Sequence, residues 1–306
     1  ISACLVGSEM CIRDRDWPIR RTAPQSEEIH AIAEAIRGAE KPLIIAGGGV
    51  HYSLAQEKLQ QLGEATGIPV AETFGGKGAI QHDADWFLGG LGLEGNPATN
   101  RLVAQADLIL SIGTRLTDFS TGSQTMFKNP DVRFAAINIA EIDAIKQGGI
   151  AAVSDARRGI EDLLSDLEGY GVSQDWSSEI RSQKDEWRPQ RAAALDPDTV
   201  FDKNAPEHAD LNIPDTDAVL TQGQLIGLMQ EHSQSGDVVI AAAGGPPGDL
   251  LKVWDATEGR HAHLEFGFSC MGYEIPAGIG VRLANPEEEK RVSVFIGDGT
   301  FLMTPT

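Results

Sequence analysis

Residues 42–49 have the sequence PLIIAGGG, an unbroken apolar run that ends in three glycines. A run of this length, bounded by a proline and by glycines, predicts a strand that is buried on both faces of a sheet. A helical stretch is expected next, near residues 54–66, and a second strand over residues 68–72. Strand, helix and strand in this order predict a right-handed βαβ unit with parallel strands.

The same alternation extends to both sides of this unit. Ser26 is expected to cap a helix whose apolar residues recur at i, i+3, i+4 and i+7 and which ends near Gly38. Further helices are predicted over residues 97–106 and 156–168, and further strands over residues 107–112, 134–139 and 151–153. Residues 17–170 are therefore predicted to form one doubly wound α/β domain.

A second α/β unit is predicted after a change in composition. Residues 171–217 are expected to be a polar helix over 174–195, interrupted by Pro189, and then a linker rich in Asp and Pro. In residues 218–306, Thr221 and Gln224 form a capping box at the start of a helix that runs to about His232. The remaining predicted elements are a strand over 237–243, a Gly/Pro loop over 244–249, a helix over 274–283 and a strand over 291–296. The predicted fold class is α/β with two doubly wound parallel-sheet domains, the first complete and the second truncated.

Both ends of the chain predict a fragment. Residues 1–16 begin with ISACLVGSEMCIRDR, which has no basic segment ahead of its apolar stretch and so does not fit a signal peptide. We interpret it as a non-native leader, which leaves Cys270 as the only native thiol. The last residues follow directly on a strand and a glycine-rich turn, where a domain is expected to continue.

Composition excludes several classes of protein. The 306 residues carry 25 Lys and Arg against 45 Asp and Glu, a formal net charge of −20, which argues against nucleic-acid binding. No apolar run approaches the ~20 residues that span a bilayer. Three cysteines form neither a disulfide framework nor a zinc pattern. A cytoplasmic enzyme or binding protein is expected.

Two glycine-rich stretches resemble phosphate-binding loops only superficially. Residues 47–49 fail the G-x-G-x-x-G spacing because the third required position is Tyr52, so a tight turn is predicted. Lys77, within FGGKG at residues 74–78, is followed by Gly and not by Ser or Thr, so we expect a flexible loop at the carboxyl edge of the sheet. His261 and His263 share one face of an expected strand but have no partners at metal-ligand spacing.

The segment from residue 261 to residue 303 is the most informative. The apolar run VSVFI at 292–296 predicts a strand that delivers Asp298, between two glycines, to the carboxyl edge of a sheet, where ligands bind in open α/β folds. Asp298 alone could cap a turn; the alternative is a ligand of Mg²⁺, which is held by one or two carboxylates and by phosphate oxygens. Met271 lies upstream, in the apolar Gly-rich segment FGFSCMGY at 266–273, and alone it would be taken for a core methionine.

Together, the S-x-M-G-Y segment at 269–273 and G-D-G-T-F-x-M at 297–303 resemble the C-terminal cofactor domain of thiamine-diphosphate enzymes of the acetolactate synthase type. The resemblance covers about residues 17–306. It implies that Asp298 is a Mg²⁺ ligand, that Met271 holds the cofactor in a bent shape and that the Ser269 carbonyl accepts from its aminopyrimidine. It also implies diphosphate contacts by Gly245, Pro246, Gly297, Gly299 and Thr300, although the double proline after Gly245 departs from the expected pattern.

The resemblance also implies a reaction. Strings such as GGGVHYS and ETFGGKGAI in the first domain favour members that use water to cleave a C–C bond of a small cyclic 1,2-diketone, in inositol catabolism. The alternatives are a carboligase or decarboxylase of 2-keto acids, and a non-catalytic nucleotide-binding module. The complete enzyme would be a homo-oligomer, a dimer or a tetramer. No catalytic residue is expected in this chain, because the activating Glu of the family lies in an N-terminal domain, so weak cofactor binding and no turnover are predicted.

Overall fold

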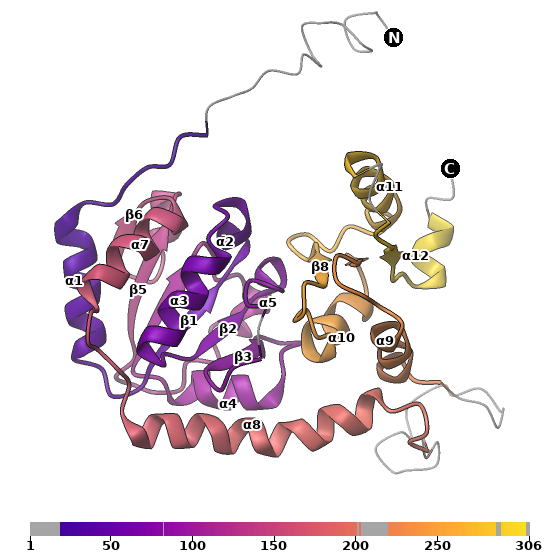
Figure 1. Ribbon diagram of the computed structural model, residues 1–306, viewed down its shortest axis with the longest axis horizontal. Helices are drawn as coiled ribbons and strands as arrows, with labels where there is room; N and C mark the ends of the chain where they lie inside the picture. Colours follow the sequence, from indigo (N-terminus) through magenta and orange to yellow (C-terminus); the bar gives the residue numbers. More distant parts are fainter. Residues whose placement is uncertain (1–18, 82, 201, 203–219, 286–288, 304–306) are drawn as a thin grey trace, which may run out of the picture.

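A computed structural model describes residues 19–81, 83–200, 202, 220–285 and 289–303 (Figure 1). The predicted leader over residues 1–16 lies outside these residues, as does most of the predicted linker. The first part of the chain forms a six-stranded parallel sheet in the order β3-β2-β1-β4-β5-β6. Its strands are β1 (Pro42–Ala46), β2 (Val70–Glu72), β3 (Phe87–Gly90), β4 (Leu108–Ile112), β5 (Arg133–Asn138) and β6 (Ile150–Val153).

Helices cover both faces of this sheet, as predicted. Alternate residues of β1 face opposite sides: Ile44 and Ala46 belong to one apolar core, and Leu43 and Ile45 to the other. The first core packs under α1 (Ser26–Arg37), α2 (Gly48–Tyr52), α3 (Gln56–Thr66) and α7 (Ala156–Asp166). The second packs under α4 (Pro97–Gln105) and α8 (Gln174–Leu195), which lie along the bottom of Figure 1. The short helices α5 (Asp118–Thr121) and α6 (Glu141–Ala144) follow β4 and β5.

The second sheet has three parallel strands in the order β8-β7-β9. Its strands are β7 (Val238–Ala241), β8 (His261–Leu264) and β9 (Val292–Val294), and its helices are α9 (Gln222–Glu231), α10 (Pro246–Val253), α11 (Glu274–Ala284) and α12 (Asp298–Met303). The core of this sheet includes Ile226, Val239, Leu250 and Leu264. The predicted capping box is confirmed, because Thr221 and Gln224 exchange hydrogen bonds of 2.9 and 3.2 Å.

Three local predictions are wrong, and one confirmed helix starts two residues later than expected. Gln25, not Ser26, precedes the first turn of α1 as its cap. The helix expected near 54–66 begins only at Gln56, because Leu54 has a φ of 52° and separates α3 from the unpredicted α2. Residues 246–249 are not a loop but the first turn of α10, since the fixed φ of proline suits the start of a helix. Pro189 does not interrupt α8: it lies on the exposed side, where water can satisfy the carbonyl group that its missing N–H leaves unpaired.

The two sheets contact each other at η1 (Phe74–Gly76), through its first residue and through Lys77, which follows it. Phe74 stacks on Phe266, which follows β8, with ring centroids 4.5 Å apart. Lys77 is only 5% exposed, and its Nζ donates a 3.3 Å hydrogen bond to the Leu251 carbonyl. The flexible loop predicted over residues 74–78 is therefore wrong: burial of Phe74 and Lys77 fixes this turn between the sheets.

Candidate functional site

The predicted cofactor residues lie on three loops at one edge of the second sheet. Ala241 pairs with Leu264 of β8, and Ile240 pairs with Val294 of β9. Because the three strands are parallel, the loops that follow them emerge at the same carboxyl edge, the usual ligand edge of an open α/β sheet. The central loop carries Gly245, the loop after β8 carries Met271, and the loop after β9 carries Asp298.

Glu274 joins two of these loops. Its side chain is fully buried; Oε1 accepts a 3.0 Å hydrogen bond from the Ala243 N–H, and Oε2 accepts a 3.1 Å bond from the Gly272 N–H. The residue is also the first of α11, where a carboxylate is favoured by the helix dipole. Glu274 thus fixes the position of the Met271 loop relative to the Gly245 loop. This role was not predicted from the sequence, where an acidic residue at the start of a helix indicates only a favourable interaction with the helix dipole.

Met271 is not a core methionine. It is 54% exposed, and its neighbour Phe268 is 84% exposed. Ser269, in the same loop, has a positive φ of 51°, which is uncommon for a residue with a side chain. The loop after β8 therefore presents apolar side chains at the open edge of the sheet, where an apolar part of a ligand can contact them.

Gly245 and Pro246 begin α10, so this helix starts at the same edge. Gly245 caps the helix, and Pro246 and Pro247, both buried, occupy its first two positions. Neither proline has an N–H group, so the first turn of α10 offers a diphosphate fewer backbone donors than an ordinary helix start. The double proline noted in the sequence thus has a structural meaning.

Asp298 is the exposed first residue of α12, and its Oδ1 accepts a 2.8 Å hydrogen bond from the Gly299 N–H. A Cβ added at Gly297 or at Gly299 would meet nothing within 4 Å, so the space beside this carboxylate is open. Within the described residues, no group of three His, Cys, Asp or Glu side chains could hold a metal ion. The donor set fits Mg²⁺ held by one carboxylate and completed by ligand oxygens, a common arrangement for this ion. Thr300 follows in the first turn of α12.

A half-buried hydrogen-bonded pair joins β8 to the end of the Met271 loop. The hydroxyl group of Tyr273 and Nε2 of His263 are 2.8 Å apart. Burial lowers the pKa of His263, while the nearby Glu265 opposes this shift. Burial also raises the pKa of Tyr273. At pH 7 both groups are therefore neutral, and the imidazole is able to accept a proton.

A cleft of about 350 Å³ separates this edge from the carboxyl edge of the first sheet. Phe266 lines it, stacked on Phe74 and edge-on to Phe119 at 4.7 Å. Glycines let the first-sheet loops meet here: a Cβ on Gly49 would lie 2.6 Å from the Gly113 Cα. The 47–49 glycines therefore serve backbone packing, in agreement with the predicted tight turn, which here leads directly into α2.

Comparison with known proteins agrees with this architecture. The sequence profile of the thiamine pyrophosphate enzyme central domain matches residues 29–163, which span the six-stranded sheet, and that of the C-terminal TPP binding domain matches residues 242–306. The chain belongs to the thiamine pyrophosphate enzyme family. Both matched regions are α/β with parallel sheets, as the sequence predicted. The family indicates thiamine diphosphate as the cofactor, and the second matched domain contains all eight residues predicted to bind it.

Three similar curated proteins are each named 3D-(3,5/4)-trihydroxycyclohexane-1,2-dione hydrolase. The chain is 40% identical to the protein from Clostridium tetani over 302 residues, 96% of this chain and 47% of that protein. It is 36% identical to the Clostridium perfringens protein over 301 residues, 96% of this chain and 47% of that protein. It is 36% identical to one from Bacillus cereus strain AH820 over 292 residues, 93% of this chain and 45% of that protein. The chain thus spans about half the length of these relatives.

Proposed function

We propose that this chain supplies the central domain and a part of the cofactor domain of an enzyme that hydrolyses 3D-(3,5/4)-trihydroxycyclohexane-1,2-dione in inositol catabolism. The observation that carries the proposal is the 40% identity to a hydrolase of that name across 96% of the chain. The open three-loop edge around Met271 and Asp298 supports it. The product would be an open-chain deoxy-sugar acid.

Two of the three loops have assigned parts in the proposed mechanism. Asp298 binds Mg²⁺, and the backbone of Gly297, Gly299 and Thr300 binds the diphosphate. When bound, thiamine diphosphate supplies an electron sink for the bond that is cleaved. Further along the edge, Met271 supports the apolar middle of the cofactor and the Ser269 carbonyl accepts from its aminopyrimidine group.

The environment of the edge suits a reaction with a ketone. His263 and Tyr273 are neutral at pH 7, so they can hold or pass a proton without adding charge next to the Met271 loop. The aromatic side chains of Phe74, Phe119 and Phe266 give the adjoining cleft apolar walls that exclude water from part of it. We expect the cyclic diketone to enter through this cleft.

Two further proposals concern the whole protein. No helix in the described part of the chain is long and apolar enough to cross a membrane. We propose a cytoplasmic location, in keeping with three scattered cysteines that form no disulfide framework. We also propose that the whole enzyme is a homo-oligomer. The acidic composition favours a protein that binds no nucleic acid.

A chimera tests the reaction. This chain replaces the matching segment of the Clostridium tetani protein, and hydrolysis of the cyclic dione is measured beside condensation of pyruvate. The proposal predicts dione hydrolysis that depends on thiamine diphosphate and Mg²⁺ and is lost in Asp298→Asn. Asp131→Asn, an exposed acid in the first domain, is the matched control and should keep the activity. Pyruvate condensation without dione hydrolysis, or full activity of Asp298→Asn, would contradict the proposal.

A further inference from the structure

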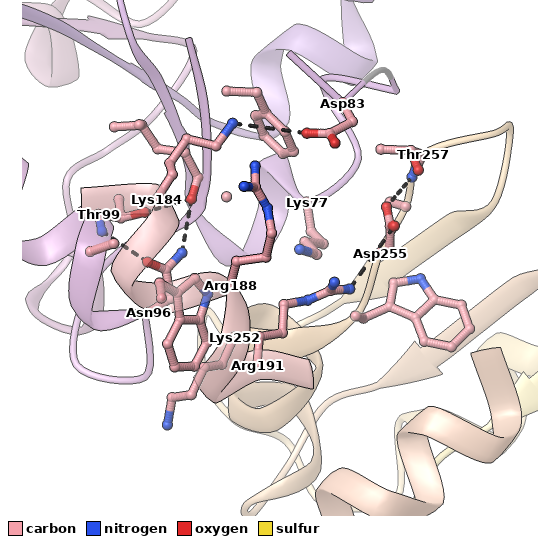
Figure 2. A pocket seen from close by; sticks show the side chains of 17 residues that line it. Lys77, Asp83, Asn96, Thr99, Lys184, Arg188, Arg191, Lys252, Asp255 and Thr257 are labelled. Atoms are coloured by element: carbon pink, nitrogen blue, oxygen red, sulfur yellow. Dashed lines mark hydrogen bonds and ion pairs between the residues drawn. The ribbon is translucent and has the colours of Figure 1, made fainter. Parts of the chain in front are cut away.

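A second cavity, of about 160 Å³, lies between the two sheets and α8, away from the three-loop edge (Figure 2). From the second sheet it is lined by the end of α10 and by residues 254–257, which lead to the amino end of β8. Met271 and Asp298 lie beyond the carboxyl ends of β8 and β9. The cavity therefore occupies the opposite edge of the second sheet and is separate from the proposed cofactor site.

Basic side chains are concentrated in this cavity. The lining contains five Lys or Arg residues among 17, whereas the chain has only 25 in 306 and a net charge of −20. The five cations are Lys77, Lys184, Arg188, Arg191 and Lys252, and the two lining carboxylates are those of Asp83 and Asp255. The lining thus carries a formal charge of +3. Figure 2 shows Lys77, Arg188 and Arg191 pointing into the same space.

Arg188 donates a 2.6 Å hydrogen bond to Asp185, outside the lining. Lys184 and Nε of Arg191 donate to the carbonyl groups of Ala84 and Val253. The other carboxylates contact the cations only at long range. Nζ of Lys184 lies 3.8 Å from Asp83 Oδ1, Nη2 of Arg191 lies 4.0 Å from Asp255 Oδ2, and Nζ of Lys77 lies 3.9 Å from Glu72 Oε2. Direct charged hydrogen bonds are about 1 Å shorter. The cations therefore keep donor capacity for an oxyanion placed between them.

Burial makes this charge costly without such an anion. The side chains of Lys77, Lys184 and Arg191 are 5%, 16% and 30% exposed. Desolvation lowers the pKa of all three groups, and the neighbouring carboxylates do not reverse the shift. An added oxyanion would replace part of the lost hydration.

One lining residue has a buried polar atom without a hydrogen-bond partner among the described residues. Trp254, which lines the cavity, is 4% exposed, and among the described residues its indole Nε1 has no hydrogen-bond partner. Buried N–H groups are nearly always paired with protein, water or ligand. Trp187, Phe87 and Leu88 add apolar surface to the lining. The cavity therefore combines convergent cations and apolar walls.

We propose that this cavity binds a small organic oxyanion, a carboxylate or a phosphate ester with a compact apolar body. Its volume is well below the roughly 300–1,000 Å³ of sites for drug-sized ligands, which favours a metabolite of a few carbons over a nucleotide. The ligand would touch β3, α8 and the end of α10 together, and so would bind both sheets at once. Because α10 begins at Gly245, this ligand would also contact the far end of a helix that starts at the cofactor edge.

Thermal unfolding of the chain with inorganic phosphate, malonate or acetate, each against sodium chloride of equal ionic strength, tests the proposal. Phosphate or malonate should raise the midpoint saturably in the wild type, and whichever acts at the lower concentration identifies the favoured group. Arg191→Gln should need at least about tenfold more anion, since a charged hydrogen bond is lost. Arg188→Gln should need severalfold more anion. This substitution should perturb folding little, because it removes only an exposed contact with Asp185, one turn earlier on α8.

Arg181→Gln is the matched control. This residue lies on α8 too and pairs with Asp85 at 3.9 Å, but it does not line the cavity. This variant should respond to each anion as the wild type does. Comparison with it also corrects for general effects of salt on stability. The proposal is overturned if no anion exceeds sodium chloride in the wild type, or if Arg188→Gln and Arg191→Gln titrate like Arg181→Gln.

Discussion

The carboxylate of Glu274 accepts a 3.0 Å hydrogen bond from the backbone N–H of Ala243, 31 residues earlier in the chain. The other oxygen of the same carboxylate accepts from Gly272, two residues before it. One fully buried side chain therefore joins the loop after β7 to the loop that carries Met271. Everything proposed for the three-loop edge depends on these loops keeping their relative positions.

Replacing Glu274 by Gln should destabilise the second sheet. An amide has one acceptor oxygen, so one of the two N–H groups would face a second donor in a buried site, a loss of about 1–3 kcal/mol. Urea unfolding measures this free energy. Glu231→Gln, at an exposed position on α9, should change the free energy of unfolding by about a few tenths of a kcal/mol at most. Equal stabilities of the two variants would show that Glu274 does not hold the loops.

Removing the Glu72 carboxylate should flatten the pH dependence of stability. Burial raises the pKa of Glu72 to about 7, against the opposing effects of Lys77 and the Ile80 N–H. The folded state thus holds a proton that the unfolded chain releases near pH 4.5. Stability from this group is full below pH 4.5, falls as the pH rises to about 7, and then levels off.

Glu72→Gln should remove this fall, which is at most about 3 kcal/mol. The measurement is the free energy of unfolding in urea at several values between pH 5 and pH 8. Glu57→Gln on α3 serves as the control and should keep the wild-type slope. A wild-type slope in Glu72→Gln would mean that Glu72 ionises normally in the folded protein.

Met271→Ala should leave the fold nearly as stable as the wild type, because the side chain is half exposed. Leu251→Ala removes a fully buried side chain from the second core and should cost about 2–5 kcal/mol. Chemical unfolding of the two variants compares these losses. A loss of stability for Met271→Ala as large as that for Leu251→Ala would indicate that Met271 packs in the core and does not belong to the cofactor site.

Phe266→Ala should loosen the contact between the two sheets. Its ring stacks on Phe74 and meets Phe119 edge-on, so truncation should cost about 1–3 kcal/mol and separate the unfolding of the two sheets into distinguishable steps. Tryptophan fluorescence and far-ultraviolet circular dichroism, which respond to different parts of the chain, detect this separation. Phe268→Ala, two residues away and 84% exposed, should unfold as the wild type does.

Local signals in the sequence were sufficient for most of the fold. The apolar run at 42–46 and the capping box at Thr221 were located correctly because neighbouring residues alone determine them. β3 was missed: its sequence, FLGG, is short and half glycine, and it pairs with β2 across a register shift between Val70 and Ala71. Nothing local marks such an edge strand.

The candidate site was predictable only in outline. The apolar run at 292–296 placed Asp298 at the carboxyl edge of a sheet, and only the family resemblance grouped Met271 and Gly245 with it. In the structure the parallel strands β7, β8 and β9 end at that shared edge. The Glu274 bridge, the pairing of His263 with Tyr273 and the burial of Lys77 against Leu251 depend on residues brought together by folding. No periodicity or spacing predicts contacts of that kind.

Nuclear magnetic resonance of the chain tests directly whether Asp298 and Met271 bind one metal–cofactor complex, and it detects weak binding too. Thiamine diphosphate is added with Mn²⁺ in place of Mg²⁺, and broadening is followed at the Gly299 amide and at the Met271 methyl group, which is assigned with Met271→Leu. Both signals should broaden only when the cofactor is present, and the broadening should disappear in Asp298→Asn but not in Asp131→Asn. Both signals staying sharp in the wild type, or equal broadening in Asp298→Asn, would contradict it.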